Sequence, residues 1–590
     1  MSRLAQRAAG YDWATYRQLF TPKLVTTLAR GYTRADLGKD AFAGMTVAVL
    51  ALPLSMAIAI GAGFPPEAGL VTAVVGGLLI SALGGSRLQV GGPAAAFIVV
   101  IATVAAEHGA SGLMTATFLA GVILVIAGMV KLGTYIKYIP GPVVTGFTSG
   151  IGVIIAISQM KDFLGLEGEV PGDFLHRLEA LWAIRGTLNP WALLIGAATI
   201  LAIVGLKRWR PEWPGLLVAV TATSAAVAAW HLPVETIDTR FGGLPSGLPT
   251  PALPDLSLAT IRAVLPETFT IAFLVGIESL LSAVAADAMA GTRHRSNMEI
   301  VAQGAANIAS PLFGGLPATG VIARTGTNIA AGARTPVAGI LHALFVLAFM
   351  LLAAPLAGYL ALPALAAVLL VTAWRLLELD HVTRFLTRAP ADDRIVLALT
   401  LVLTVVVDLS VAIAVGVVIA SMLFMHRMAE TPGVRPGTSH VLLDDTPDDT
   451  QARSRIMTME LPAGVRVLEL TGPLFFGATA RLGVSFQSLA EWPRALILRM
   501  REVPLVDASG IGALEELAML ADRHGCRIVI SGLQPQPREA LHRYGFLRQH
   551  HIVLASNSYM ALEKAKRIAA GEHVAAPADA ASAESKGPRH

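Results

Sequence analysis

The stretches GGSRLQVGGPAAAF (residues 84–97) and GGLPATGVIARTGTNI (residues 314–329) share one pattern. In each, a Gly/Pro-rich approach leads into a short apolar segment, and Pro93 and Pro317 are 224 residues apart. Such approaches interrupt a helix, because proline lacks the N–H that the preceding turn needs. The two stretches therefore predict a matched pair of short, broken helices.

The rest of the chain places these stretches in a membrane domain. Of its 590 residues, 54% are hydrophobic and 15% are charged, against about a quarter charged in soluble domains. From about Ala41 to Phe424 the apolar residues form repeated runs that approach or reach the length needed to cross about 30 Å of hydrocarbon. We predict fourteen membrane segments, near residues 41–61, 68–84, 93–106, 113–130, 138–158, 189–206, 214–230, 266–288, 298–313, 319–332, 335–354, 357–373, 395–408 and 409–426.

Charge predicts the orientation of these segments. The first forty residues are polar and basic and show no cleavable signal peptide, so this arm should stay in the cytoplasm. The inner loops then hold thirteen Lys and Arg and the outer loops five, as the positive-inside rule requires. The net charge of +4 reflects these membrane borders and predicts no nucleic-acid partner. We expect a multi-pass protein of the bacterial inner membrane with both termini cytoplasmic, and an amphipathic stretch at the outer surface (residues 173–184).

The prolines also indicate two halves. Pro140 and Pro363 are 223 residues apart, close to the offset of the first pair. Segments 1–7 and 8–14 are therefore predicted repeats, and because seven is odd their orientations must be opposite. This is the signature of an inverted-repeat transporter whose broken third and tenth helices meet near the bilayer midplane.

The C-terminal part has the composition of a soluble domain. After a Gly/Pro-rich and acidic linker, three β-like runs (465–470, 495–500 and 527–531) alternate with helical stretches, among them residues 478–489, which predicts a small α/β domain. The single Cys526 should be a core residue of it. We predict a cytoplasmic arm (1–40), a transmembrane transport domain of core and gate (41–427), a linker (428–453), the α/β domain (454–570) and a disordered tail (571–590).

One carboxyl lies deep in the predicted membrane domain. Glu278 is about twelve residues, or roughly 18 Å by helical rise, into the eighth segment. An idle charge there costs at least about 2.5–3.5 kcal/mol, so the residue is functional by default. It can carry a proton as a coupling group; with Ser279 and Ser282 beside it, the group could instead hold Na⁺. The structural alternative is a carboxyl satisfied inside the bundle.

Arg324 is a cation that is also predicted to lie deep in the membrane domain. It lies about eight residues, or roughly 12 Å by helical rise, from the cytoplasmic end of the tenth segment, which is long for a side chain that reaches to the surface. Near two opposed helix N-termini, a guanidinium makes an anion site, which ionised Glu278 could neutralise. Small residues admit backbone N–H groups to the ligand, and the predicted lining is Ala94, Ala95, Thr319 and Gly320.

Several stretches carry a family resemblance. Residues 84–97, IPGPVVTGFTSGIGVI (139–154), GIESLLSAVAADAMAGTRHRSN (276–297) and AQGAANIASPLFGGLPATGVIARTGTNI (302–329) resemble the SulP sulfate-permease family of anion transporters. The resemblance covers almost the whole chain. VPLVDASGIGAL (503–514) resembles the STAS domain that follows the transporter in this family.

The resemblance implies fourteen segments in two inverted repeats, a core that moves against a gate, and usually a homodimer. It implies an anion between the third and tenth segments, near Glu278 of the eighth. Sodium-dependent members tend to have Asp with Thr one turn later, whereas Glu278 and Ser282 stand here and favour protons. Arg324 matches an arginine of many dicarboxylate and vertebrate members. Ala94 replaces the threonine of bicarbonate-type members.

Two further positions depart from the family pattern. Leu54 stands where the first segment usually has Gln, which removes one polar ligand; Ser55 beside it joins the candidate substrate-binding residues. In the STAS part, Asp507 to Gly510 fits a loop that carries a phosphorylatable residue in anti-sigma-factor antagonists. Ser509 is its one serine, and Ala508 can occupy the acceptor position instead.

The chain shows no Ser/His/Asp triad, P-loop or metal-ligand spacing, so we expect neither an enzyme nor a bound cofactor or metal. The predicted function is proton-coupled uptake of a small anion, either a C4-dicarboxylate or an inorganic oxyanion such as sulfate. One alternative is sodium-coupled bicarbonate or sulfate transport. Another class is a membrane-tethered STAS signalling protein, against which the deep Glu278 and Arg324 argue.

Overall fold

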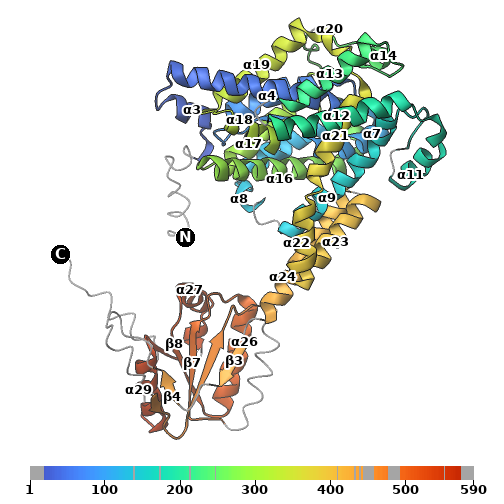
Figure 1. The fold of residues 1–590 in the computed structure, drawn as a ribbon. Coiled ribbons are helices and arrows are strands. Elements are labelled where there is room, and N and C mark those ends of the chain that lie inside the picture. The colour runs from blue at the N-terminus through green and yellow to red at the C-terminus, as the bar shows by residue number, and fades with distance from the viewer. Residues whose placement is uncertain are drawn as a thin grey trace. The chain divides into compact units, whose positions relative to one another are not determined.

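The chain divides into two compact units, residues 1–420 and 421–590, which are described separately (Figure 1). The computed structural model describes residues 19–136, 140–171, 174–210, 214–245, 247–407, 409–430, 433–436, 440–442, 458–475, 492–549 and 552–572.

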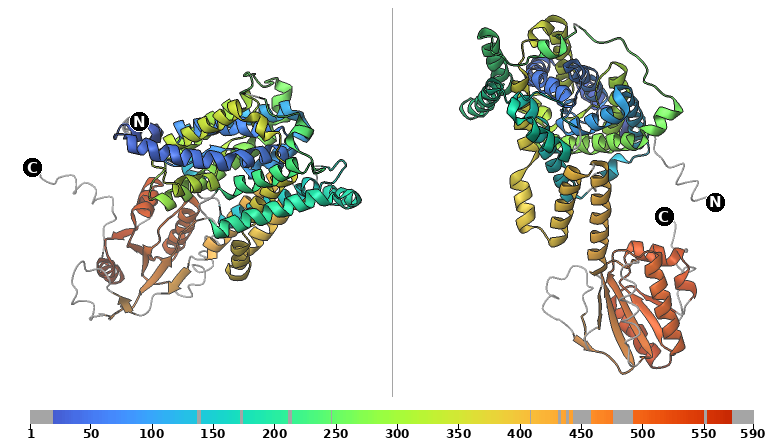
Figure 2. Two further views of the ribbon diagram at one scale, coloured as in Figure 1. Left: turned by 45° about the horizontal axis from the view of Figure 1, so that its top comes forward. Right: turned by 90° about the vertical axis from the view of Figure 1, so that its right-hand side faces the viewer.

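The first unit is built of helices that pack lengthwise beside one another (Figure 2). Their bounds follow in chain order: α3 (Lys23–Leu28), α4 (Arg34–Gly61), α5 (Pro66–Val71), the π-helical turn η1 (Thr72–Gly76), α6 (Gly77–Leu83), the 3₁₀ turn η2 (Ala95–Phe97), α7 (Ile98–Met129), α8 (Gly133–Ile136), α9 (Gly141–Ser158), α10 (Met160–Leu164), α11 (Phe174–Ala183), η3 (Arg185–Thr187), α12 (Pro190–Trp209), α13 (Gly215–Ala229), α14 (Ile237–Phe241), α15 (Leu258–Ala263), α16 (Leu265–Ala290), α17 (Ser296–Leu312), α18 (Ile322–Ala330), α19 (Val337–Leu352), α20 (Ala354–Ala357), α21 (Leu362–Leu376), α22 (Leu379–Arg388), α23 (Ala391–Val406) and α24 (Leu409–Glu430).

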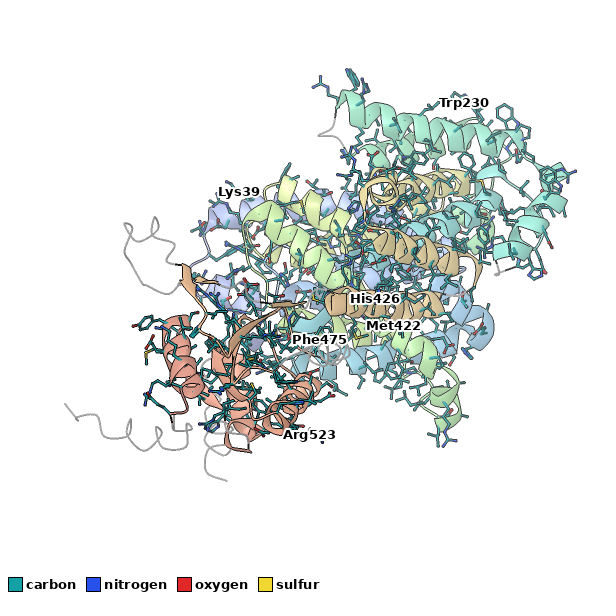
Figure 3. All side chains as sticks on the ribbon, turned by 90° about the horizontal axis from the view of Figure 1, so that it is seen from below. Lys39, Trp230, Met422, His426, Phe475 and Arg523 are labelled. Carbon is teal, nitrogen blue, oxygen red and sulfur yellow. The ribbon has the colours of Figure 1, made fainter. Side chains whose placement is uncertain are left out.

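Within the described part of the chain, eight helices are long and apolar enough to cross a membrane, and α13 and α19 are shorter apolar helices. A helical polytopic membrane domain is therefore confirmed. In Figure 3, exposed Lys39 near the start of α4 and Trp230 just after α13 lie toward different sides of this unit. Trp230 is 73% exposed, as expected of an aromatic ring at an interface.

Each of the fourteen predicted segments coincides with helix. The third and fourth belong to one element, α7, which is interrupted at Gly109, where φ is 70° and ψ is 178°. This positive φ suits glycine, because residues with a side chain rarely adopt such a backbone conformation. The second segment contains η1, a π-helical turn, a feature frequent at functional sites. The amphipathic stretch forms α11 from Phe174, and residue 173 lies outside the described residues.

Two very short strands join distant parts of the first unit. β1 (Gly91–Gly92) pairs antiparallel with β2 (Thr319–Gly320), with Gly91 opposite Gly320. Because the strands run in opposite directions, the helical segments that follow them, η2–α7 and α18, begin side by side and leave in opposite directions. The two Gly/Pro-rich stretches of the sequence therefore meet in space.

The second unit is an α/β domain with a mainly parallel sheet, as predicted. Its five strands lie in the order β3-β6-β7-β8-β9; β6 to β9 are parallel, and β3 pairs antiparallel with β6 at the edge. The described elements are β3 (Gly433–Pro436), β4 (His440–Leu442), β5 (Thr458–Glu460), β6 (Val465–Thr471), β7 (Ala495–Glu502), α26 (Ala508–Arg523), β8 (Arg527–Ser531), α27 (Pro535–Arg543), α28 (Phe546–Gln549), β9 (Val553–Ala555) and α29 (Ser558–Ala569).

Helices cover both faces of this sheet, with α26 and α29 on opposite sides (Figure 1). Alternation along β7 explains this: Leu496 and Leu498 join the core under α26, whereas Ala495 and Ile497 join the core under α29, since successive side chains of a strand point to opposite faces. Cys526 lies in the core as predicted, and burial raises the pKa of its thiol to about 12.

The sequence did not predict four of the strands described in the second unit, β3, β4, β5 and β9. β3 and β4 fall within the predicted linker (428–453), and β5 and β9 have only three residues each, too few for a recognisable apolar pattern. β3 is an edge strand with only β6 as a neighbour in its sheet. An edge strand is less covered than a central one, so its sequence lacks the continuous apolar run by which the central strands were predicted. The predicted helix 478–489, the end of the tail (573–590) and the start of the arm (1–18) lie outside the described residues.

Removal of the second unit should leave a membrane unit that still binds its anion. A chain that ends at Glu430 keeps the whole of α24 and stops before β3, so it cuts no regular element. A chain that ends within α24 is the control, and it should be poorly folded because it exposes a truncated apolar helix. Titration of sulfate, fumarate and bicarbonate by calorimetry checks this. A monodisperse Glu430 truncation without affinity would mean that the second unit helps to build the site.

Candidate functional site

Neighbouring helices form hydrogen bonds with the segments around the paired strands β1 and β2. We call this pair, with the two short helical segments that follow it, the β1–β2 crossing. The N–H of Leu316 donates to Thr72 Oγ1 of η1 (2.6 Å), and the N–H of Ala318 donates to Asn307 Oδ1 of α17 (2.9 Å). On the other side, the N–H of Val90 donates to Thr325 Oγ1 of α18 (3.1 Å). Buried backbone groups in an apolar bundle need such partners, and these bonds hold the two short segments together.

Arg324 lies at the crossing and is fully buried, with 0% exposure. Its Nη2 donates to Ser55 Oγ of α4 (2.8 Å) and to the carbonyl of Pro93 (3.4 Å), and its Nη1 donates to the carbonyl of Gly91 (3.5 Å). Its Nε has no hydrogen-bond partner among the residues that the structure describes. The side chain therefore points into the bundle and does not reach the surface. It presents an unsatisfied donor beside the helix N-termini.

Glycine at position 92 makes room for this guanidinium. A Cβ on Gly92 would lie 2.0 Å from Arg324 Nη1 and 2.9 Å from Cζ, and the φ of Gly92 is +154°. Real Cβ atoms do not approach so closely, so any side chain here must displace the guanidinium. Gly92 is thus a requirement of the site that the Gly/Pro pattern indicated without giving its reason.

We therefore expect Gly92→Ala to weaken anion binding at least about tenfold, or about 1.4 kcal/mol. The cause is displacement of the Arg324 guanidinium together with backbone strain of about 1–3 kcal/mol. Gly205→Ala in α12 is the matched control, because a Cβ there meets no atom within 4 Å. Calorimetric titration of both purified variants measures the difference. Equal affinities would show that Arg324 tolerates displacement.

Glu278 of α16 is partly buried, and its Oε2 is a buried atom without a hydrogen-bond partner. Within the described residues, no ion pair joins it to Arg324. The direct neutralisation that the sequence suggested is therefore absent in this conformation. Both groups retain an unsatisfied polar atom inside the bundle, which costs free energy unless a ligand or proton compensates.

The two serines near Glu278 have different surroundings. The Ser279 hydroxyl donates to the carbonyl of Gly276 in its own helix (3.1 Å), and the Ser279 carbonyl accepts from Gln89 Nε2 (2.9 Å). Ser282 Oγ lies 3.4 Å from Thr325 Oγ1, next to Arg324 in sequence. Ser282 thus connects the helix of Glu278 to the helix of Arg324.

The predicted lining residues gather at the crossing. Ala94, Ala95 and Thr319 are buried, and Ala94 immediately precedes η2. Thr319 Oγ1 donates to the carbonyl of Val275 in α16 (3.4 Å). Gly320 lies opposite Gly91 in the β1–β2 pair. The structure therefore brings segments one, three, eight and ten together around one buried cation.

Sequence reasoning missed three polar residues here. Gln89 packs against Gly320, where a Cβ would lie 1.5 Å from Gln89 Nε2, and its Oε1 is buried without a partner. Asn328 Nδ2 donates to the carbonyl of Leu88 (2.9 Å). His342 of α19 has 0% exposure and no partner for either ring nitrogen. Each is a polar residue in an apolar segment, which is the signal that could have identified them.

In the second unit, Ser509 lies exposed in the first turn of α26. Asp507 caps this helix, and its Oδ1 accepts from the N–H of Gly510 (2.8 Å). Ala508 is exposed as well. Both positions are thus accessible at one helix N-terminus, where a phosphate would be favourably placed.

A cation buried where two short segments cross inside a polytopic helical bundle defines a membrane transporter of anions. The sulfate permease family matches residues 37–400, and the STAS domain matches residues 457–559. The chain belongs to the sulfate permease family and carries a C-terminal STAS domain; it is an anion transporter and not an enzyme.

Relatives support the same assignment. The chain is 38% identical over 523 residues to YvdB of Bacillus subtilis, named as a candidate sulfate transporter, covering 88% of this chain and 96% of that protein. It is 30% identical over 522 residues to the bicarbonate transporter BicA of Picosynechococcus, covering 85% of this chain and 90% of BicA.

Solved structures show the same fold. Murine Slc26a9 in its inward-facing state gives a TM-score of 0.80 at 19% identity, covering 94% of this chain and 95% of that one. The transmembrane domain of a cyanobacterial BicA gives 0.60 at 30% identity, covering 65% of this chain and 98% of that domain.

Proposed function

We propose that the chain takes up a small anion by proton symport, and that the anion is a C4-dicarboxylate or an inorganic oxyanion such as sulfate. The observation that carries this proposal is the fully buried Arg324 with its unpartnered Nε. Guanidinium groups bind carboxylate and sulfate oxygens through paired N–H donors. The substrate-binding residues in this proposal are Ala94, Ala95, Thr319, Gly320, Arg324 and Ser55.

The coupling ion in this proposal is a proton carried by Glu278, with Ser279 and Ser282 beside it. The unpartnered Oε2 of Glu278 supports a carboxyl that changes its protonation during transport. Ser282 reaches toward Thr325, and the Ser279 hydroxyl is bonded within its own helix. This leaves few side-chain oxygens to surround Na⁺, which prefers several oxygen ligands. No cofactor or metal takes part.

The finer architecture is part of the same proposal. Segments 1–7 and 8–14 form two inverted repeats, and the antiparallel β1–β2 pair supports this, since it is the contact that two such halves would make. The protein would lie in a bacterial inner membrane as a homodimer with both termini in the cytoplasm. Ser509 would be a regulatory phosphorylation site of the STAS domain.

Uptake by purified protein in proteoliposomes tests the function. Labelled sulfate, fumarate and bicarbonate are supplied separately under an imposed proton gradient or an imposed sodium gradient. We expect accumulation of sulfate or fumarate with the proton gradient alone. The second candidate, sodium-coupled bicarbonate or sulfate transport, has support from the likeness to BicA, and accumulation that requires sodium would replace our proposal with it.

A further inference from the structure

A second region of the first unit has the properties of an anion site. It is a hollow of about 610 Å³ away from the β1–β2 crossing, within the range of about 300–1,000 Å³ usual for small-molecule sites. One carboxylate, Asp36, lines it, against six cations: Lys23, Arg30, Arg87, Arg293, Arg295 and Arg334. We refer to it as the basic hollow.

The cations come from separate parts of the chain. Lys23 belongs to α3, Arg30 follows it, Arg87 precedes β1, Arg293 and Arg295 lie between α16 and α17, and Arg334 follows α18. The positive-inside rule explains basic loops on the cytoplasmic side. The rule does not require basic residues of five segments to line one hollow, because scattered charges would orient the membrane helices equally well.

Most of these charges have no acidic partner. Arg334 Nη1 pairs with Asp36 Oδ1 at 2.8 Å. Within the described residues, no carboxylate forms an ion pair with the other five cations. The nearby Asp287 is already engaged, because its carboxylate pairs with His294 (2.6 Å) and accepts from Thr292 Oγ1 (2.7 Å).

Burial and the crowding of positive charges lower the pKa of two of these basic groups. Burial and the neighbouring Arg295, Arg30 and Arg87 lower the pKa of Lys23, and Asp287 opposes them only in part. Burial and Arg30 also lower the pKa of Arg295. Like charges held together in this way destabilise the empty hollow, and an anion that enters it removes the repulsion.

The hollow is connected to the crossing through the segments before β1 and after α18. Arg87 Nε donates to the carbonyl of Arg334 (2.7 Å), which joins the approach to β1 to the end of α18. Close by, Asn328 of α18 donates to the carbonyl of Leu88. An anion that binds Arg87 in the hollow would therefore stabilise the two short segments that form the crossing.

We propose that the basic hollow binds a phosphate-bearing anion distinct from the transported one, and that this ligand stabilises the β1–β2 crossing. A phosphate group fits because it carries up to two charges and several acceptor oxygens, which suit a cluster of guanidinium groups. The shared chemistry is a phosphate monoester or diphosphate, whether it belongs to a lipid headgroup or to a soluble molecule.

The test uses the full chain in detergent at low ionic strength, with inorganic pyrophosphate as the probe. We expect the parent to bind it and the Lys23→Gln/Arg30→Gln double variant to bind at least about tenfold more weakly. Arg375→Gln is the control, because Arg375 is an exposed cation of α21 outside the hollow.

Two results would overturn the proposal: no binding by the parent, or equal binding by the double variant, which would place pyrophosphate outside the hollow. The source of the phosphate is then resolved in vesicles of phosphatidylcholine with or without phosphatidic acid. Competition by phosphatidic acid supports a lipid headgroup in the hollow, and its absence supports a soluble ligand.

Discussion

Arg324→Ala should weaken anion binding by roughly 30-fold or more, the effect of losing about 2–5 kcal/mol when one member of a buried, hydrogen-bonded charge pair is removed. The guanidinium is fully buried, and within the described residues its Nε has no hydrogen-bond partner. The N-termini of η2–α7 and α18 add to its positive field. Because the attraction scales with ligand charge, sulfate or fumarate should lose more affinity than a monovalent anion.

Two further variants give this prediction its controls. Arg324→Lys should recover part of the affinity, because it keeps the charge but loses the paired donors. Arg375→Ala removes an exposed cation of α21 and should bind like the parent. Calorimetric titration of the purified proteins measures all three. Parent-like affinity in Arg324→Ala would mean that its contact with Ser55 is purely structural.

Glu278→Gln should abolish gradient-driven accumulation while the protein still folds and binds its anion. Glutamine occupies the same volume but cannot exchange a proton, so anion movement would no longer be tied to the proton gradient. In symport the two ligands must bind cooperatively: protonation of Glu278 removes a negative charge from the bundle and leaves Arg324 free to attract the anion. No ion pair joins Glu278 to Arg324 within the described residues, so protonation of Glu278 must act on Arg324 through the electrostatic potential and not through direct contact.

The matched control is Glu267→Gln. Glu267 lies in the same helix, α16, roughly 16 Å nearer its N-terminus by helical rise. Within the described residues its buried Oε2 has no hydrogen-bond partner, although His108 Nε2 lies 3.9 Å away. It should accumulate anion like the parent in proteoliposomes. Parent-like accumulation by Glu278→Gln under a proton gradient would exclude Glu278 as the coupling group, whereas a loss in both variants would indicate general damage to α16.

Local patterns of the sequence were enough to predict that the first unit is a helical polytopic membrane domain, although they did not indicate short helices such as α14, α15 and α22. Apolar runs, basic loops and the Gly/Pro approaches all act within a few turns of helix, so their consequences can be read without knowing the partners. The same holds for β8, predicted at 527–531 and found at Arg527–Ser531. The depths of Glu278 and Arg324 in the membrane stay predictions, which rest on distance along a helix.

Contacts between distant residues were decided by the tertiary structure alone. Ser55 and Arg324 are 269 residues apart, and their hydrogen bond has no local signal. The close approach of the Arg324 guanidinium to residue 92 explains why that residue must be glycine, which spacing could suggest but not explain. β3 became a strand only because β6 offered it an unpaired edge. The basic residues were visible in the sequence as markers of orientation, and folding brought six of them into one hollow, because charge fixes the side of the membrane but packing fixes the neighbours.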